Sequence, residues 1–260
     1  MPIGRSLHVG INQVSPAFPN ATRLDGPEND ADRMRNLARD RGFQTDLIPP
    51  SDADRGNVIK KLLAMAEASH PGDIFLFTFA GHGTSRIMQP DLDRDEIEDQ
   101  AILLYDRWFY DDEFKLTIWP AFRKGVRVLM VADSCFSGTV ASKAKAKSNG
   151  LQKRAISDEV REEHLKTYGE FYRQLMVPVY APVEASILLL AACEDFDETP
   201  DGYPLGPFTA ALLKVVNEQD PQNYTDLIEK IRKLVGPQVP QLFPFPRVDQ
   251  EFGAQKPLMS

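Results

Sequence analysis

The sequence predicts an α/β fold: a mostly parallel sheet, flanked by helices on both faces. Short apolar runs typical of buried strands alternate along the chain with segments whose apolar residues recur at helical spacing. The run IFLFTFA, residues 74–80, is apolar at nearly every position, as expected for a strand covered on both faces. Strands that alternate with helices are joined by right-handed crossovers and therefore lie mostly parallel.

Residues 1–83 contain three predicted strands and two predicted helices. Residues 7–11 form a short apolar run, and a helix is expected within residues 25–43, where Met34, Leu37 and Ala38 recur at helical spacing before Gly42. Residues 44–48 follow as a strand that Pro49 and Pro50 close. A second helix within residues 51–73 places Val58, Leu62 and Met65 on one side and ends at His70-Pro71-Gly72, before the strand 74–83.

The remaining elements follow from the same criteria. Further strands are predicted at residues 101–106, 126–133 and 186–194, because each is a short, mostly apolar run. Helices are predicted at residues 117–125, 206–218 and 224–235.

One domain, residues 1–260, is expected, because no linker separates two cores. Within it, residues 1–140 form a larger part, residues 141–182 an exposed basic and charged insertion, and residues 183–260 a smaller C-terminal part. The insertion begins with small, basic and turn-forming residues and continues into what reads as a polar helix.

Composition excludes several classes of partner. A formal charge of −8 argues against a phosphate-binding surface, so no nucleic acid is expected. The longest apolar runs are too short to cross a membrane, and the first residues do not resemble a signal peptide. Two cysteines do not make a disulfide framework, which favours a reducing compartment and hence the cytoplasm. A monomer is favoured over an oligomer.

Two apolar strands end in reactive side chains. His82 follows the strand 74–83, and Cys135 follows the strand 126–133. Since ligands bind at the carboxyl ends of parallel strands, these residues could meet there, with Gly81 and Gly83 allowing close backbone approach. An imidazole beside a thiol generates the thiolate nucleophile and then protonates a leaving amine.

Each reactive residue type also has a structural interpretation. A cysteine inside an apolar strand is usually a small buried hydrophobe, and this interpretation is favoured for Cys193. The remaining histidines, His8, His70 and His164, are expected to face solvent rather than a substrate.

The motifs around the reactive pair resemble those of a known family. FAGHGT (79–84) followed by ADSCFSGT (132–139) is similar to the caspase-like cysteine peptidases, and specifically to the metacaspase and orthocaspase branch. LDGPENDADRM and YDDEF resemble earlier segments of that branch, and AACEDFDET, GPFTAALL and QVPQLF resemble its C-terminal part. The resemblance runs along nearly the whole chain and implies a caspase-hemoglobinase-like fold with a sheet of about six strands.

The resemblance also implies site roles. Cys135 and His82 would form a catalytic dyad, with the backbone N–H groups of Gly83 and Cys135 as the oxyanion hole. Asp30 and Asp133 would line the pocket for the residue before the cut, where they attract Arg or Lys. Helix capping is the alternative role for Asp30. Asp195 resembles a third acidic position, although the alignment there is ambiguous with Asp197.

No cofactor is required for this chemistry, but the resemblance brings calcium as a candidate activator. Ser142 replaces an acid of the family pattern, which puts the calcium site in doubt. The candidate ligands are Asp99, Asp111, Asp112 and Glu113.

The leading hypothesis is therefore a cysteine endopeptidase that cuts protein or peptide substrates after Arg or Lys. Self-cleavage is expected in the basic part of the insertion, where the candidate residues are Lys143, Lys145, Lys147, Lys153 and Arg154. Two alternatives stay open: a peptidase of the same fold with another specificity, and a catalytically silent caspase-like module that serves as a scaffold.

Overall fold

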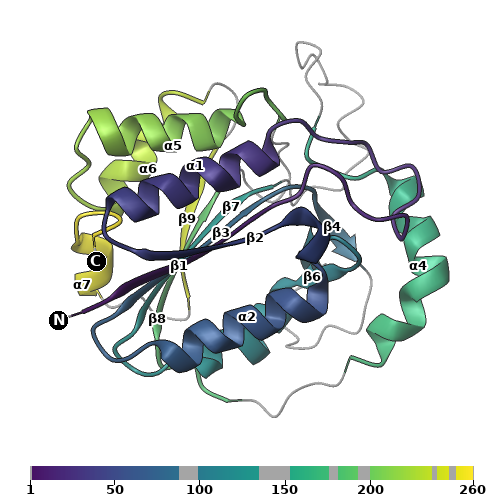
Figure 1. The fold of residues 1–260 in the computed structure, drawn as a ribbon, viewed down its shortest axis with the longest axis horizontal. Coiled ribbons are helices and arrows are strands. Elements are labelled where there is room, and N and C mark those ends of the chain that lie inside the picture. Colours follow the sequence, from purple (N-terminus) through teal and green to yellow (C-terminus); the bar gives the residue numbers. More distant parts are fainter. Residues whose placement is uncertain are drawn as a thin grey trace.

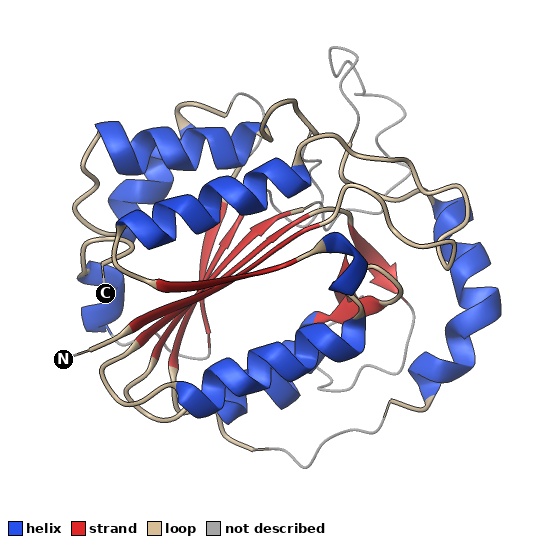
Figure 2. Ribbon diagram, in the orientation of Figure 1, coloured by secondary structure: helices blue, strands red, loops and turns tan. Residues whose placement is uncertain are grey.

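A computed structural model describes residues 2–87, 99–134, 153–175, 181–192, 200–235, 239–245 and 250–259. Its centre is a six-stranded sheet in the order β2–β1–β3–β7–β8–β9 (Figures 1 and 2). The strands are β1 (Gly4–Gly10), β2 (Gln44–Ile48), β3 (Ile74–Ala80), β7 (Arg127–Asp133), β8 (Ser186–Ala191) and β9 (Gln241–Phe245). All pairs are parallel except β8–β9, so the predicted α/β class and mostly parallel sheet are confirmed.

Helices cover both faces of this sheet. The helices are α1 (Pro27–Asp40), α2 (Arg55–Ala68), α4 (Asp158–Arg173), α5 (Pro207–Glu218), α6 (Tyr224–Arg232) and α7 (Gln250–Ala254). Alternate side chains of β3 point to opposite sides: Phe75 and Phe77 join the core beneath α2, whereas Leu76 joins the core beneath α1, α5 and α6 (Figure 1). Both cores explain why the strands lack the polar alternation of a half-exposed sheet.

The sixth strand of the sheet is not the one that the sequence predicts. The run expected at 101–106 forms β5 (Asp99–Leu103), which pairs with β4 (Gly83–Ile87) and β6 (Trp108–Tyr110) in a separate antiparallel sheet. The sixth position is taken by β9, an edge strand that tolerates Pro244. The prediction of a helix at 117–125 is also wrong. The chain before β7 instead forms a short helix α3 (Asp111–Glu113), a π-helical turn (Phe114–Ile118) and a 3-10 turn (Trp119–Ala121).

The predicted insertion at 141–182 is exposed only in part. Residues 141–152 and 176–180 lie outside the described residues, but α4 packs on the core through Val160 and Tyr172. Ser157 caps α4 by accepting a hydrogen bond from the Val160 N–H. The segment that leads into the helix is likewise buried at Arg154 and Ile156. The charged side chains of Glu163, Lys166, Glu170 and Arg173 are exposed, as the composition predicts, whereas Arg154 and the core-facing side of α4 are buried.

The prediction that three histidines face solvent holds only for His70, which is exposed. His8 lies on β1, where its Nδ1 and Nε2 are each 2.8 Å from a hydroxyl oxygen, those of Thr78 and Ser6. His164 lies on α4 and stacks on Phe18 with ring centroids 4.0 Å apart. Both are fully buried in apolar surroundings with polar partners for their ring nitrogens. Within the described ranges, no helix is long and apolar enough to cross a bilayer.

Candidate active site

The two reactive residues follow neighbouring strands. β3 and β7 pair in parallel, and Ala80 and Asp133 face each other at their carboxyl ends. His82 comes two residues after Ala80, and Cys135 comes two residues after Asp133. Cys135 itself lies outside the described residues. The pairing of β3 with β7 therefore shows only that the segments leading to His82 and to Cys135 leave the sheet at the same edge.

The His82 side chain is buried, and only one of its two ring nitrogens has a hydrogen-bond partner among the described residues. Its Nε2–H donates to the carbonyl of Thr22 at 2.7 Å, whereas Nδ1 has no hydrogen-bond partner among the described residues. Burial lowers the pKa of His82, although the carbonyls of Thr22 and Arg154 oppose that effect. The ring is therefore neutral near pH 7, and the Thr22 bond assigns its proton to Nε2. Nδ1 then carries the free lone pair that a general base needs.

Gly81 sets the turn that brings His82 to this position. Its φ of +157° is rarely adopted by other residues, and a Cβ there would lie 2.9 Å from the ring of Phe79. A side chain at position 81 would therefore disturb both the turn and the strand before it.

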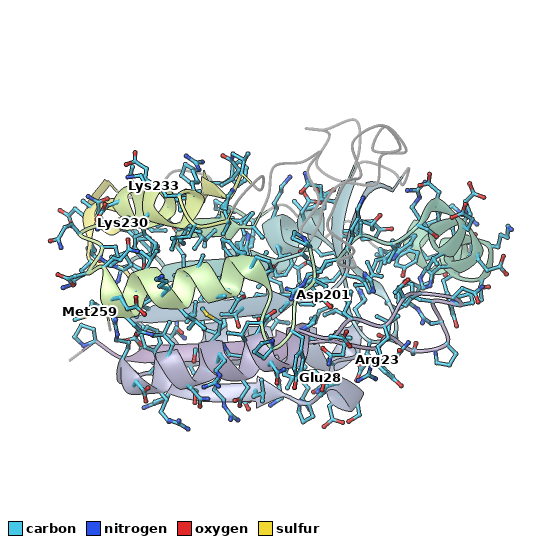
Figure 3. All side chains as sticks on the ribbon, turned by 90° about the horizontal axis from the view of Figure 1, so that it is seen from above. Arg23, Glu28, Asp201, Lys230, Lys233 and Met259 are labelled. Atoms are coloured by element: carbon cyan, nitrogen blue, oxygen red, sulfur yellow. The ribbon has the colours of Figure 1, made fainter. Side chains whose placement is uncertain are left out.

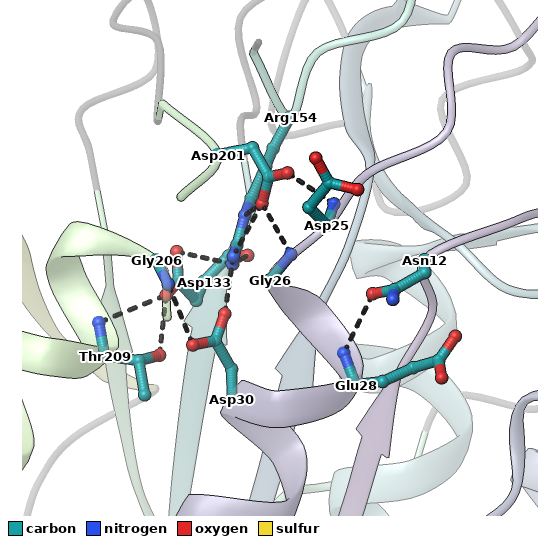
Figure 4. A network of polar contacts seen from close by, with 10 residues as sticks. All are labelled: Asn12, Asp25, Gly26, Glu28, Asp30, Asp133, Arg154, Asp201, Gly206 and Thr209. Atoms are coloured by element: carbon teal, nitrogen blue, oxygen red, sulfur yellow. Dashed lines mark hydrogen bonds and ion pairs between the residues drawn. The ribbon is translucent and has the colours of Figure 1, made fainter. Parts of the chain in front are cut away.

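A fully buried arginine, Arg154, is surrounded by three carboxylates (Figure 4). Arg154 Nη2 is 2.5 Å from Asp30 Oδ2 and 3.2 Å from Asp201 Oδ1. Its Nη1 donates to the carbonyl of Asp133 at 2.9 Å and is 3.0 Å from Asp133 Oδ1. Its Nε donates to Asp201 Oδ1 at 3.3 Å. We call Asp30, Asp133 and Asp201 the carboxylate triad.

Other groups hold the triad in place. The Gly206 N–H donates to Asp30 Oδ1 at 2.9 Å, and the Thr209 hydroxyl donates to Asp133 Oδ2 at 2.6 Å. Asp201 accepts from the backbone N–H groups of Asp25 and Gly26 just before α1, at 2.6 and 3.2 Å. Figure 3 shows Asp201 near Arg23 and Glu28 and away from Lys230 and Lys233. The triad therefore joins the start of α1, the end of β7 and the loop before α5.

Three carboxylates surround one guanidinium here, and burial and this excess of acids together shift the pKa values of Asp30 and Arg154. Burial raises the pKa of Asp30 to about 7, and the Asp133 carboxylate adds to that rise, while Arg154 opposes it. For Arg154, burial acts to lower the pKa, but Asp133 and Asp30 outweigh it, so the net shift is upward and the guanidinium stays charged. The site is therefore built for a cation and holds one carboxyl that protonates easily.

The backbone of Arg154 is engaged as well. Its carbonyl accepts a hydrogen bond from the Gly83 N–H at 2.9 Å. Isolated bridges pair Ala155 with Gly83 in parallel and Lys153 with Pro200 in antiparallel fashion. Residues 153–155 thus lie extended between the start of β4 and the loop before α5, as an added strand does.

The structure brings together most of the predicted site residues that it describes. Asp30 and Asp133 both contact Arg154, and the Asp30 side chain does not cap its own helix. Asp195 lies outside the described residues, as do the candidate cleavage residues Lys143, Lys145 and Lys147. Lys153 is half-buried next to Arg154.

Asp201 was missed by sequence reasoning. It stands in ETPDGYP, where Asp-Gly reads as a turn signal, and its partners lie 47 and 176 residues away along the chain. No local pattern marks such a residue.

The candidate calcium ligands do not fit a metal site as the structure stands. Lys115 lies 3.1 Å from Asp111 and 3.7 Å from Asp112, and Glu113 pairs with Arg55. Asp99 begins β5. Over the described part of the chain, no group of three or more metal-ligating side chains is suited to an ion.

This architecture defines a class: an α/β protein with a histidine at the end of one parallel strand and an acidic, arginine-binding site at the end of the next. The sequence profile described as "Caspase domain" matches residues 5–251, so the chain belongs to the caspase domain family. Members of this family are cysteine peptidases, and the fold is caspase-like.

Individual relatives agree with this assignment. Metacaspase-1 of Candida albicans is 23% identical over 92% of this chain and 64% of its own length, and Metacaspase-1 of Saccharomyces cerevisiae (strain S288c) is 25% identical over 88% and 62%. The chain thus spans less than two thirds of these relatives.

Solved structures extend the likeness. A Geobacter sulfurreducens protein has a TM-score of 0.85 and 33% identity, with 99% of both chains covered. Caspase-1 from Spodoptera frugiperda has a TM-score of 0.62 at 14% identity, covering 98% of this chain and 92% of that one, which is a likeness of fold alone.

Proposed function

We propose that this protein is a cysteine endopeptidase that hydrolyses peptide bonds after Arg or Lys through Cys135 and His82. The observation that carries the specificity is Arg154, whose guanidinium is fully buried among three carboxylates. Buried charges need partners with good geometry, so a site of this kind is a recognition site for a cationic side chain.

The chemistry would run as follows. His82 Nδ1 takes the thiol proton of Cys135, and the sulfur attacks the carbonyl carbon after the basic residue. The Gly83 N–H, which now binds the Arg154 carbonyl at 2.9 Å, would stabilise the oxyanion of the tetrahedral intermediate. Protonated His82 gives its proton to the departing amine and leaves a thioester. Water then hydrolyses the thioester, which regenerates the thiol and releases the new carboxylate.

A test against the scaffold alternative uses a thiol-directed peptide electrophile with arginine next to the reactive group. We expect intact mass to show one label per chain, located at Cys135, and no label in Cys135→Ala. The same electrophile with aspartate in place of arginine is the matched control and should label far more slowly, because the triad repels a carboxylate. An unlabelled wild type that also leaves arginyl and lysyl peptides uncut would support the scaffold.

The position of Arg154 also supports self-processing, and it favours one of the five candidate bonds. The side chain occupies the triad while the carbonyl is bound by Gly83, so the Arg154–Ala155 bond has the two contacts proposed for a substrate. Until that bond is cut, Arg154 would compete with substrates for the triad. After the cut, residues up to 154 would be free to leave it.

Mass analysis of freshly purified protein tests this bond. We expect wild type to contain fragments 1–154 and 155–260, and Cys135→Ala to stay intact. Lys153→Ala, which changes the neighbouring basic residue, should still be cut, whereas Arg154→Gln should not be cut at this position. An intact wild type that cleaves added peptides would rule self-processing out.

The proposal extends to the substrates, location and calcium response of this enzyme. Its substrates would be proteins or peptides with a basic residue before the cut, and it would act as a cytoplasmic monomer. Calcium as an activator rests on the family resemblance, and an ion that uses Asp111 or Asp112 would have to displace Lys115.

A further inference from the structure

The triad contacts every nitrogen of the Arg154 guanidinium, and one of these contacts belongs to arginine alone. Asp30 and Asp133 meet the terminal nitrogens Nη2 and Nη1. Asp201 Oδ1 meets the internal nitrogen Nε at 3.3 Å as well as Nη2 at 3.2 Å. Lysine has no donor at the Nε position, because its chain carries a methylene group there.

Lysine would also fall short of the far end of the site. Its ammonium lies as many bonds from Cα as the central carbon of a guanidinium, one bond short of Nη1 and Nη2. A compact ammonium in place of Arg154 could not approach Asp30 as Nη2 does, at 2.5 Å, without moving the chain. Buried carboxylates would then be left with fewer partners, which is costly.

The walls of the site fit a flat group. A Cβ on Gly206 would lie 2.5 Å from Arg154 Nη2, and a Cβ on Gly26 would lie 2.9 Å from it. Both glycines have negative φ values that other residues adopt freely, −61° and −91°. They are therefore needed for space and not for backbone conformation: the guanidinium lies against bare backbone.

We propose that Asp201 is a specificity-determining residue that makes this site select arginine over lysine. The inference rests on the proposed function and sharpens its substrate class. Asp30 and Asp133 supply charge for either basic side chain, whereas Asp201, with Gly26 and Gly206, recognises the planar guanidinium.

Three peptides that differ only in the residue before the cut provide the test. That residue is arginine, lysine, or arginine methylated at its internal guanidinium nitrogen. For wild type we expect kcat/KM to fall about tenfold or more from arginine to either of the others, since one charge-assisted hydrogen bond corresponds to about a tenfold change. Competition from Arg154 lowers all three rates equally, so the ratios are unaffected by self-occupancy.

Two variants locate the selectivity. Asp201→Asn removes the charge and keeps one side-chain oxygen, which can accept from the backbone N–H of Asp25 or of Gly26 but not from both, as the two carboxylate oxygens do. It should lower the rate on arginine about tenfold and the rate on lysine by less than about threefold, and no longer distinguish the methylated arginine. Gly206→Ala should likewise reduce the arginine rate more than the lysine rate. Asp220→Asn, an exposed acid paired with Lys256, is the matched control and should change none of the ratios.

The outcomes separate the inference from the function. Equal cleavage after arginine and lysine by wild type, or an Asp201→Asn variant that lowers both rates equally, overturns the role of Asp201 and leaves the peptidase intact. Because the methylated peptide is tested on wild type, a poorly folded variant does not decide the matter. Failure to cleave any of the peptides, with Cys135 unlabelled, overturns the proposed function and this inference together.

Discussion

His8 and His82 are both buried histidines associated with neighbouring strands of one sheet, yet their surroundings differ in one respect. Both ring nitrogens of His8 have hydroxyl partners at 2.8 Å. His82 has a partner for Nε2 only, and its Nδ1 has none among the described residues. Burial lowers the pKa of both rings.

The difference separates a structural histidine from one available for chemistry. A ring with two satisfied nitrogens has no lone pair to offer without breaking a buried hydrogen bond. A ring with one nitrogen tied to a carbonyl is held in a fixed tautomer and keeps its second lone pair available. Burial and lowered pKa are common to both, so they do not by themselves mark the functional residue.

The largest effect that would test this comparison is on turnover. His82→Asn should lower kcat/KM on an arginyl peptide by about 10²- to 10⁴-fold, the usual contribution of a general acid–base residue. His8→Asn should leave kcat/KM per folded molecule within about twofold, because His8 lies outside the reacting groups. A comparable loss in both variants, with both folded by circular dichroism, would erase the distinction.

The next largest effect is on stability, with the roles reversed. His8→Ala would leave the Ser6 and Thr78 hydroxyls buried without this partner, at a cost of about 3 kcal/mol in the free energy of unfolding at pH 7. Urea unfolding would measure that difference against wild type.

The same variant has a pH signature. Burial lowers the pKa of His8 from 6.5 to about 3, so below pH 6.5 the unfolded chain binds a proton that the folded chain does not. Wild type should therefore lose about 1.4 kcal/mol per pH unit through His8 as the pH falls below 6.5, while His8→Ala escapes that loss. The gap between the two proteins should narrow at pH 5.5, and a constant gap would mean that His8 does not stay neutral in the fold.

A smaller effect concerns which group controls activity in weak acid. Burial lowers the pKa of His82, which favours the neutral ring, whereas it raises the pKa of Asp30 to about 7. Protonated Asp30 no longer attracts a cation, and departure of Arg154 removes the charge that holds this pKa down, so kcat/KM on arginyl peptides should rise about tenfold or more between pH 6 and pH 8. Asp30→Asn should be slower throughout and lack this rise. An acidic limb centred well below pH 6 in wild type would assign control to another group.

Calcium should produce the smallest effect. Because Lys115 already neutralises Asp111 and Asp112, millimolar calcium should raise the rate by about twofold at most. Lys115→Met should enlarge the response and Asp112→Asn should abolish it, as measured by peptide cleavage in calcium and in chelator. Identical rates in all three proteins would reduce these acids to structural ion pairs.

Local sequence patterns were sufficient for the elements that the core defines. The strands at β3 and β7 could be predicted because nearly every residue is apolar, and α1 because Met34, Leu37 and Ala38 recur at helical spacing. The edge strand β9 could not, because Pro244 argues against a strand unless its place at the sheet edge is known.

The site divides in the same way. Asp133 could be assigned because it comes two residues before Cys135 in the sequence, and Asp30 because a family motif contains it. Asp201 and the burial of Arg154 depend on contacts between segments far apart in the chain. His8 and His164 were expected at the surface because the Thr78 hydroxyl, the Ala17 carbonyl and the Phe18 ring that bury them come from distant segments.

The position of residue 154 between two adjacent strands has a consequence for folding. β7 and β8 are parallel neighbours, paired from Arg127–Ser186 to Ala132–Ala191, and a cut after Arg154 would place them on different chains. The fragments would remain joined, since parting them would open the middle of the sheet and expose both apolar faces to water. Once unfolded and diluted, however, a cut molecule must find a second chain before it can rebuild that sheet. Refolding would change from a first-order to a second-order process, so self-cleavage would leave an enzyme that folds easily only once.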